Sequence, residues 1–136
     1  GEIAPDFTLL TPEGDSLSLY SVKAKVKILD FWASWCNPCR QENPNILKLY
    51  QKYQSKGLEI ISFSLDNDPR AWKKAIEEDG MIWKHFSDLK AQGSPIASMY
   101  NLMSIPCTFL LDENNKIVGK NLRGAQLQKK VAELLK

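Results

Sequence analysis

Residues Phe31–Pro44 read FWASWCNPCRQENP and contain Cys36 and Cys39, two of the 3 cysteines in the chain. Two cysteines separated by two residues are typical of a redox dithiol or of half of a metal site. A structural zinc site needs four ligands, and only Cys107 and His85 remain in the sequence to complete one. The motif therefore favours redox chemistry of the cysteine pair itself, with no metal and no other cofactor.

The pair lies where a strand is followed at once by a helix. Val26–Trp32 is almost entirely apolar, which predicts a strand buried on both faces, and a helical pattern covers residues 38–55. Cys36 would then lie at the helix N-terminus, where free N–H groups and the helix dipole lower the pKa of a thiol. Cys39 follows almost one turn later, within reach of a disulfide. We expect Cys36 to be the exposed attacking sulfur and Cys39 the shielded second one.

The rest of the chain alternates strands with helices early and forms a hairpin late. At 136 residues it is expected to form one α/β domain over residues 1–136, with a mixed central sheet covered by helices on both faces. Hydrophobic periodicity and turn residues place the other elements as follows: an N-terminal hairpin of Ile3–Leu10 and Ser16–Leu19, strands at Leu58–Leu65 and Ile82–Phe86, helices at 68–79, 94–101 and Gln126–Leu135, and a hairpin of Cys107–Leu111 and Lys116–Val118.

Asp30 is unusual because it interrupts the apolar strand six positions before Cys36. Alternation along the strand would direct its side chain inward beneath the helix, where an unpaired carboxyl group is costly and its pKa is raised. Such a group can act as a general base that deprotonates Cys39. The alternative is an edge position facing solvent, with no role in chemistry.

Pro106 stands between Ile105 and Cys107 at the start of an apolar strand, where proline normally interrupts strand pairing. A cis Ile105–Pro106 bond would explain this placement.

These features together resemble the thioredoxin superfamily. The resemblance is carried by Trp35-Cys36-Asn37-Pro38-Cys39, by Asp30 before it and by Ile105-Pro106 after it. The opening Ala4–Leu9 (APDFTL) and the stretch Phe31–Cys36 are more similar to its TlpA/ResA-like branch. These thiol–disulfide oxidoreductases are often grouped with the redoxin and alkyl hydroperoxide reductase/thiol-specific antioxidant proteins. The resemblance runs from residue 4 to about residue 135, and implies a thioredoxin-like fold with an extra strand–helix insert between residues 66 and 93.

The resemblance also implies a role for each motif residue. Cys36 would be the nucleophile, Cys39 the resolving thiol, and Asp30 the buried acid. Pro106 would be the cis-proline facing the disulfide, and the backbone of Ile105 would pair with an incoming peptide.

Other residues near the motif receive more limited predictions. Trp35 is expected to form an apolar rim for a docking protein, and Asn37 and Pro38 to contact substrate and tune the redox potential. Cys107, after the cis-proline, is either a packed small hydrophobic residue or a third thiol that reaches the pair. A solvated helix face is expected for Arg40, Gln41 and Glu42, and His85 is assigned no role.

Charge and hydropathy restrict the partners. The net charge is only +2, from 18 basic and 16 acidic residues, and no dense basic block points to nucleic acid. The apolar runs are too short to cross a bilayer. The first residue is Gly1, so either a targeting segment has been removed or the chain is a fragment of a longer precursor. Membrane contact would come only through a missing N-terminal anchor, and the resemblance implies a bacterial extracytoplasmic location, in the periplasm or cell envelope.

The leading functional hypothesis is thiol–disulfide exchange with protein substrates. Because no G-x-G-x-x-G nucleotide fingerprint is present, a separate electron donor or acceptor protein is expected. A thiol peroxidase of the peroxiredoxin kind is one alternative, although Ala33-Ser34-Trp35 precedes Cys36 where peroxiredoxins have a threonine. A copper chaperone is another, with Cys36, Cys39 and His85 as ligands.

Overall fold

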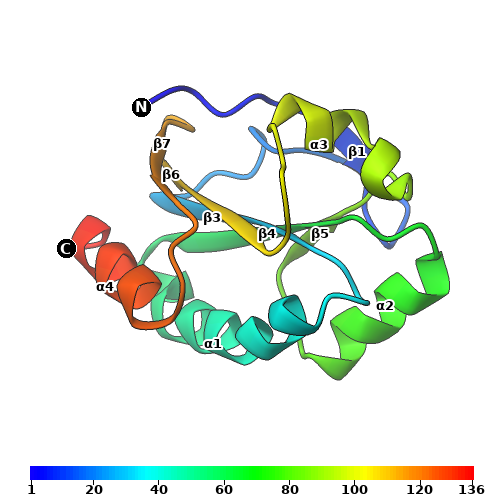
Figure 1. The fold of residues 1–136 in the computed structure, drawn as a ribbon. Helices are drawn as coiled ribbons and strands as arrows, with labels where there is room; N and C mark the ends of the chain where they lie inside the picture. The colour runs from blue at the N-terminus through cyan, green and yellow to red at the C-terminus, as the bar shows by residue number, and fades with distance from the viewer.

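A five-stranded mixed sheet forms the centre of the computed structural model, which describes residues 1–136 (Figure 1). Its strand order is β5-β4-β3-β6-β7. Strand β3 pairs in parallel with β4 and antiparallel with β6, so the predicted mixed sheet is confirmed. The strands are β3 (Val26–Trp32), β4 (Leu58–Ser64), β5 (Lys84–Phe86), β6 (Cys107–Asp112) and β7 (Ile117–Lys120).

The N-terminal hairpin is present but shorter than expected. Strands β1 (Thr8–Leu10) and β2 (Ser16–Ser18) pair antiparallel as a separate two-stranded sheet. Ile3 does not belong to the hairpin, because it forms an isolated antiparallel bridge with Lys116 instead. The start of the chain is therefore tied to the turn before β7.

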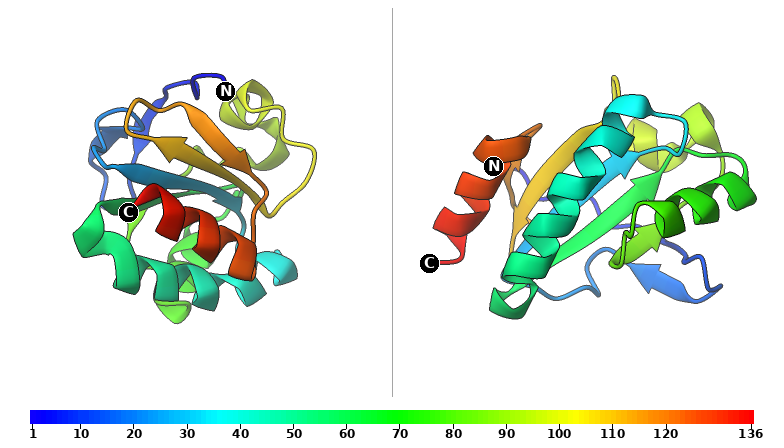
Figure 2. Two further views of the ribbon diagram at one scale, coloured as in Figure 1. Left: turned by 90° about the vertical axis from the view of Figure 1, so that its left-hand side faces the viewer. Right: turned by 90° about the horizontal axis from the view of Figure 1, so that it is seen from below.

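Helices cover both faces of the sheet, as predicted. In Figure 1, helices α1 (Asn37–Tyr53), α2 (Pro69–Glu78) and α4 (Gly124–Leu134) lie below the sheet. The short helix α3 (Pro95–Met99) and the N-terminal segment lie above it, and the view from below in Figure 2 shows α1 crossing the strands. None of the helices has both the length and the apolar composition needed to cross a membrane.

The expected insert contains one helix and one strand, and the helix comes first. Helix α2 begins where the sequence predicts, because the Asp68 side chain accepts the N–H of Arg70 at 3.0 Å and Pro69 occupies the first turn. After α2 the chain returns as β5, which pairs in parallel with β4 and forms one edge of the sheet. Two short 3₁₀ segments, Gln54–Lys56 and Ala91–Gly93, complete the fold.

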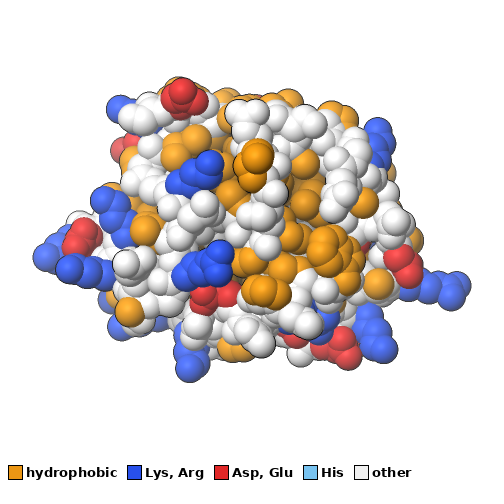
Figure 3. All heavy atoms as spheres, viewed as in Figure 1, with side chains coloured by type: hydrophobic (Ala, Val, Ile, Leu, Met, Phe, Trp, Pro, Cys, Tyr) orange, Lys and Arg blue, Asp and Glu red, His pale blue; other side chains and the backbone are white.

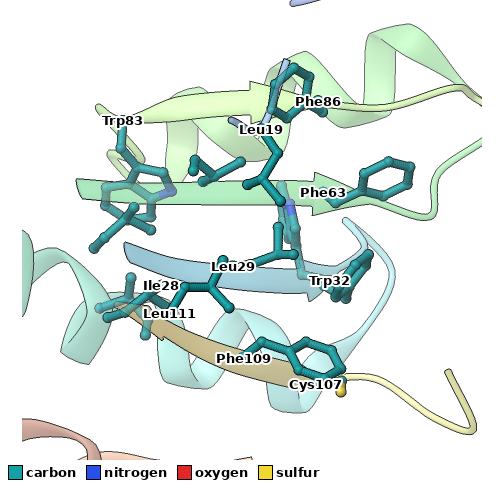
Figure 4. Close-up of a cluster of buried hydrophobic side chains, with 14 of the residues drawn as sticks. Leu19, Ile28, Leu29, Trp32, Phe63, Trp83, Phe86, Cys107, Phe109 and Leu111 are labelled. Carbon is teal, nitrogen blue, oxygen red and sulfur yellow. The ribbon is translucent and has the colours of Figure 1, made fainter. Parts of the chain in front are cut away.

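Strand β3 lies at the centre of the core, and all of its residues are buried. The ring of Phe31 packs on those of Phe63 and Tyr100, with centroids 5.4 and 5.2 Å away, so it faces the α3 side. Because side chains alternate along a strand, Asp30 faces the opposite side, which α1 covers. Figure 4 shows how side chains of neighbouring strands form this core. The alternation of β3 thus places a carboxyl group under the helix that carries the cysteines.

Candidate active site

The cysteine pair forms a disulfide at the N-terminus of α1. Cys36 is the N-cap residue, and its Cα lies 5.2 Å from that of Cys39. The backbone N–H of Cys39 donates to Cys36 Sγ at 3.3 Å, and Pro38 occupies the first turn. After reduction, this N–H and the helix dipole would favour negative charge on the same sulfur. The helix start therefore supplies the conditions for an activated thiol.

The expected difference in exposure between the two cysteines is not found. Cys36 is 5% exposed and Cys39 is 2% exposed, so the prediction of an exposed Cys36 is wrong for the disulfide form. The reason is the capping geometry: the Cys36 side chain turns toward the first turn of α1 instead of pointing outward. Trp35, Asn37 and Pro38 are exposed beside it, with Trp35 at 58%.

A loop before β6 borders the disulfide. Its Ile105–Pro106 bond is cis, as predicted, and both residues are half-buried. Figures 1 and 2 show this loop next to the N-terminal end of α1. Met103 in the same loop is 95% exposed. Figure 3 shows hydrophobic side chains gathered in the middle of this face.

Two segments that contribute to this face carry no charged side chain, although Figure 3 shows Lys and Arg side chains on the same face, beside the hydrophobic patch. No Asp, Glu, Lys or Arg occurs in residues 31–39 or 94–111. A surface made of these segments can bind apolar and neutral groups but offers no ion pair of its own to a ligand.

Asp30 is buried under α1, as predicted, with 4% of its surface exposed. Burial raises the pKa of its carboxyl group to about 7, a hydrogen bond from Ser62 opposes the rise, and the charge of Glu42 adds to it. The Ser62 hydroxyl donates to Asp30 Oδ2 at 3.1 Å. A carboxyl group with this pKa is poised to gain or lose a proton near neutral pH.

Cys107 lies on the other face of the sheet. It is the register partner of Phe31, whereas Thr108 is the partner of Asp30, and Figure 4 shows Cys107 beside Phe109. The thiol is buried, and burial raises its pKa. These features are those of a packed small hydrophobic residue, and they favour this interpretation of Cys107 over that of a third thiol that reaches the cysteine pair.

His85 is buried in β5 and takes no part in a metal group. Its Nε2 lies 2.8 Å from the carbonyl oxygen of Met81, and burial lowers its pKa to about 4. The structure has no group of three or more His, Cys, Asp or Glu placed to hold a metal ion. The copper hypothesis therefore lacks the third ligand that the sequence offered.

A buried carboxylate missed by the sequence reasoning holds the segment before Cys36. Asp66 is 2% exposed and accepts the backbone N–H of Ser34 at 3.1 Å and the Ser34 hydroxyl. The hydroxyl of Ser64 also donates to it. The serines in the largely apolar β4 are the one available signal, because a buried hydroxyl needs a partner.

Gln41 is exposed on α1 as expected, but Arg40 is half-buried and paired, so the prediction of a solvated face is wrong for Arg40. Its Nε bonds Asp79 Oδ2 at 2.6 Å, and its Nη2 lies 3.2 Å from Glu78 Oε1, which joins α1 to α2. Its Nη1 donates to the carbonyl oxygen of Ser34 at 3.0 Å. Ser34 is therefore held from both sides, through its N–H and hydroxyl by Asp66 and through its carbonyl by Arg40. No local pattern indicates this contact, because the acidic partners lie almost forty positions away.

The strand order and the disulfide at the start of the helix after β3 define a thiol–disulfide oxidoreductase of thioredoxin-like fold. The model of the AhpC/TSA family matches residues 1–120, and the chain belongs to this family.

Similar proteins agree with this assignment. The thiol–disulfide oxidoreductase ResA of Bacillus thuringiensis subsp. konkukian is 32% identical over the whole chain, which covers 76% of that protein. The thioredoxin-like protein YneN of Bacillus subtilis is 36% identical over 86% of this chain and 68% of its own length.

Among solved structures, the thioredoxin domain of a thiol–disulfide oxidoreductase from Bacteroides vulgatus matches with a TM-score of 0.93 and 36% identity. That match covers 100% of this chain and 97% of the other. The resemblance, the fold and the thiol–disulfide oxidoreductase function expected from the sequence are therefore confirmed.

Proposed function

We propose that the chain exchanges disulfides with protein substrates through Cys36 and Cys39. The observation that carries the proposal is their disulfide at the N-terminus of α1, where Cys36 Sγ already accepts the N–H of Cys39. This arrangement provides a sulfur whose negative charge is stabilised and a second sulfur within bonding reach.

In the reducing direction, the Cys36 thiolate attacks one sulfur of a client disulfide, and the other client sulfur leaves as a thiolate. The Cys39 thiolate then attacks Cys36 Sγ, which breaks the mixed disulfide and releases the second client sulfur. The enzyme ends in the disulfide form and must receive two electrons from a donor protein. Running the same steps backward oxidises a client dithiol and passes its electrons to an acceptor.

Asp30 serves in this proposal as the base that takes the proton of Cys39 before the second attack. Its position on the α1 side of β3 and its pKa of about 7 support the role. A base works best when its pKa is near the working pH, because it is then partly ionised and still binds a proton well.

The client would bind across the uncharged surface beside the disulfide. Trp35, Asn37 and Pro38 are exposed on the α1 side, and Ile105 and Pro106 lie on the loop opposite. A client segment could pair with the Ile105 backbone as an added strand while its side chains contact Trp35.

The setting of the protein is also a proposal. Residues 1–136 would form one domain of a longer precursor in the bacterial periplasm or cell envelope, held to a membrane only through an N-terminal anchor. The ResA proteins that match the whole chain are longer than it, since the chain covers 76% of the first of them. An oxidising compartment suits a disulfide that must persist between cycles.

Trapping of the mixed disulfide tests the proposal. The Cys39→Ser variant, offered a disulfide-bonded client protein, should accumulate a covalent adduct through Cys36 that dithiothreitol releases. The Cys36→Ser variant should form none. The proposal fails if Cys39→Ser gives no adduct, or if both variants retain wild-type turnover.

A further inference from the structure

Two side chains outside the cysteine motif form a hydrogen-bonded chain that ends on Asp30. The indole Nε1 of Trp83 donates to Ser62 Oγ at 2.8 Å, and Ser62 Oγ donates to Asp30 Oδ2 at 3.1 Å. Ser62 is 0% exposed, Asp30 is 4% exposed and Trp83 is 7% exposed, so water does not compete for these bonds.

The strand register produces this contact. Asp30 in β3 and Ser62 in β4 are direct partners in the parallel pair, so their side chains leave the sheet on the same face. Trp83 precedes β5, which pairs with β4, and Figure 4 shows its indole lying across β4. A shift of one residue in the β3–β4 register would move Ser62 to the other face of the sheet and break the hydrogen bonds from Trp83 to Ser62 and from Ser62 to Asp30.

The first bond determines the direction of the second. An indole nitrogen can only donate, so the Ser62 oxygen is the acceptor in that bond. The one hydrogen of the Ser62 hydroxyl then has Asp30 as its partner. An ionised carboxylate accepts such a hydrogen more strongly than a neutral acid does, because the bond is charge-assisted.

We propose that Trp83 and Ser62 are positioning residues that fix a hydroxyl hydrogen on Asp30 and hold its carboxylate ready as the proton acceptor of the exchange reaction. The functional half of this inference rests on the proposed role of Asp30 as the base. The structural half, a donor chain that favours the ionised carboxylate, stands without it.

Other groups around Asp30 act in known directions. From α1, Cys39 is its proposed proton donor, and the charge of Glu42 raises the carboxyl pKa. From β6, Cys107 is a neutral thiol whose own pKa Asp30 helps to raise. From β5, His85 is neutral above pH of about 4. None of these groups supplies a hydrogen bond to the carboxylate, so Ser62 is its one side-chain donor.

Thr108 provides a matched control. It is the register partner of Asp30 in the neighbouring strand β6, as Ser62 is in β4, and it also carries a hydroxyl group. Its hydroxyl donates to the carbonyl oxygen of Leu122 at 3.1 Å and not to Asp30. Removing either hydroxyl deletes a polar group next to the same carboxyl group, but only removal of the Ser62 hydroxyl deletes a hydrogen bond to Asp30.

The test is the pKa of the Asp30 carboxyl group, measured by carbon NMR of the full chain in the wild type and in Ser62→Ala, Trp83→Phe and Thr108→Val. Ser62→Ala should raise this pKa by about one pH unit, since a charge-assisted bond is lost. Trp83→Phe should raise it less, because Ser62 keeps its hydrogen but loses its fixed orientation. Thr108→Val should leave it unchanged.

Turnover supplies the functional readout. If the pKa rises from about 7 by one unit, the ionised fraction at pH 7 falls from about one half to about one tenth. The resolving step of Ser62→Ala should then be about fivefold slower at pH 7 and recover at higher pH. If the Asp30 carboxyl pKa were the same in Ser62→Ala and Thr108→Val, the proposed role of the hydrogen bond from Ser62 would be overturned.

Failure of the base role would look different. Asp30→Asn with wild-type turnover at every pH would remove Asp30 from the reaction, while the NMR comparison would still decide whether the donor chain acts on its carboxyl group. Mixed-disulfide trapping in Cys39→Ser depends on neither result.

Discussion

The carboxylate of Asp66 accepts the backbone N–H of Ser34 at 3.1 Å, two residues before the sulfur that caps α1. The same carboxylate accepts the hydroxyls of Ser34 and Ser64. One buried side chain thus connects the end of β4 to the segment that carries the nucleophile.

Replacing Asp66 by Asn should loosen this segment. An amide NH₂ cannot accept the bonds that one carboxylate oxygen accepts now, so buried donors lose their partner. We expect the oxidised protein to lose about 1–3 kcal/mol of unfolding free energy, measured by urea denaturation. Ser64→Ala is the comparison: it leaves Ser34 bound but removes a donor to the carboxylate and the acceptor of the Asp66 backbone N–H, so it isolates the bonds made by Ser64. Equal stability of Asp66→Asn and the wild type would contradict a stabilising role for the bonds between Asp66 and Ser34.

The Arg40–Asp79 ion pair should contribute more to stability than the Arg40–Glu78 ion pair does. Arg40→Ala removes the bonds to Asp79 and to the Ser34 carbonyl, and we expect a loss of about 1–2 kcal/mol. Glu78→Ala removes only the outer partner, whose side chain is 52% exposed, and should change stability by less than about 0.5 kcal/mol. Chemical denaturation of both variants gives the comparison, and a Glu78→Ala loss as large as that of Arg40→Ala would count against it.

Stability should depend little on pH between about 4 and 6.5 because two buried groups act in opposite directions. The folded-state pKa of His85 lies near 4, below its usual 6.5, so the unfolded chain binds more protons and stability rises with pH there. The folded-state pKa of Asp30 lies near 7, above its usual 3.8, so the folded chain binds more protons and stability falls with pH.

Asp30→Asn should expose the histidine contribution. In this variant the Asp30 contribution, which lowers stability as the pH rises, is gone. The free energy of unfolding should then rise by roughly 3 kcal/mol from pH 4 to pH 6.5 because of His85. At pH 8 the variant should be more stable than the wild type, because no carboxylate is buried. Urea denaturation across this pH range checks both statements, and a flat profile for Asp30→Asn would refute the assignment.

Cys107 should behave as a core residue and not as a third thiol. In the Cys36→Ser/Cys39→Ser variant, the folded protein should react with a thiol reagent only as fast as it unfolds, since this thiol is buried and its pKa is raised. The same variant in denaturant is the control and should react at once. Rapid labelling of the folded form would instead support a thiol that reaches the pair.

The sequence predicted the elements that depend on local patterns. The predicted strand Val26–Trp32 has the observed bounds because a strand buried on both faces is a mostly apolar run, and α2 begins at the Asp68-Pro69 signal. The burial of Asp30 followed from alternation in the same strand. Contacts between distant segments could not be predicted. Whether Ser62 meets Asp30 depends on the β3–β4 register, and whether Arg40 meets Asp79 depends on how α2 packs beside α1.

The lack of charge in residues 31–39 and 94–111 has a consequence for how clients arrive. Long-range attraction between opposite charges speeds encounters only where a surface carries a field, and dissolved salt weakens that attraction. These two segments should therefore add little to attraction over distance, and any effect of ionic strength on the association rate should come from the charged side chains around them. Selection among clients would then take place after contact, through the fit of apolar groups.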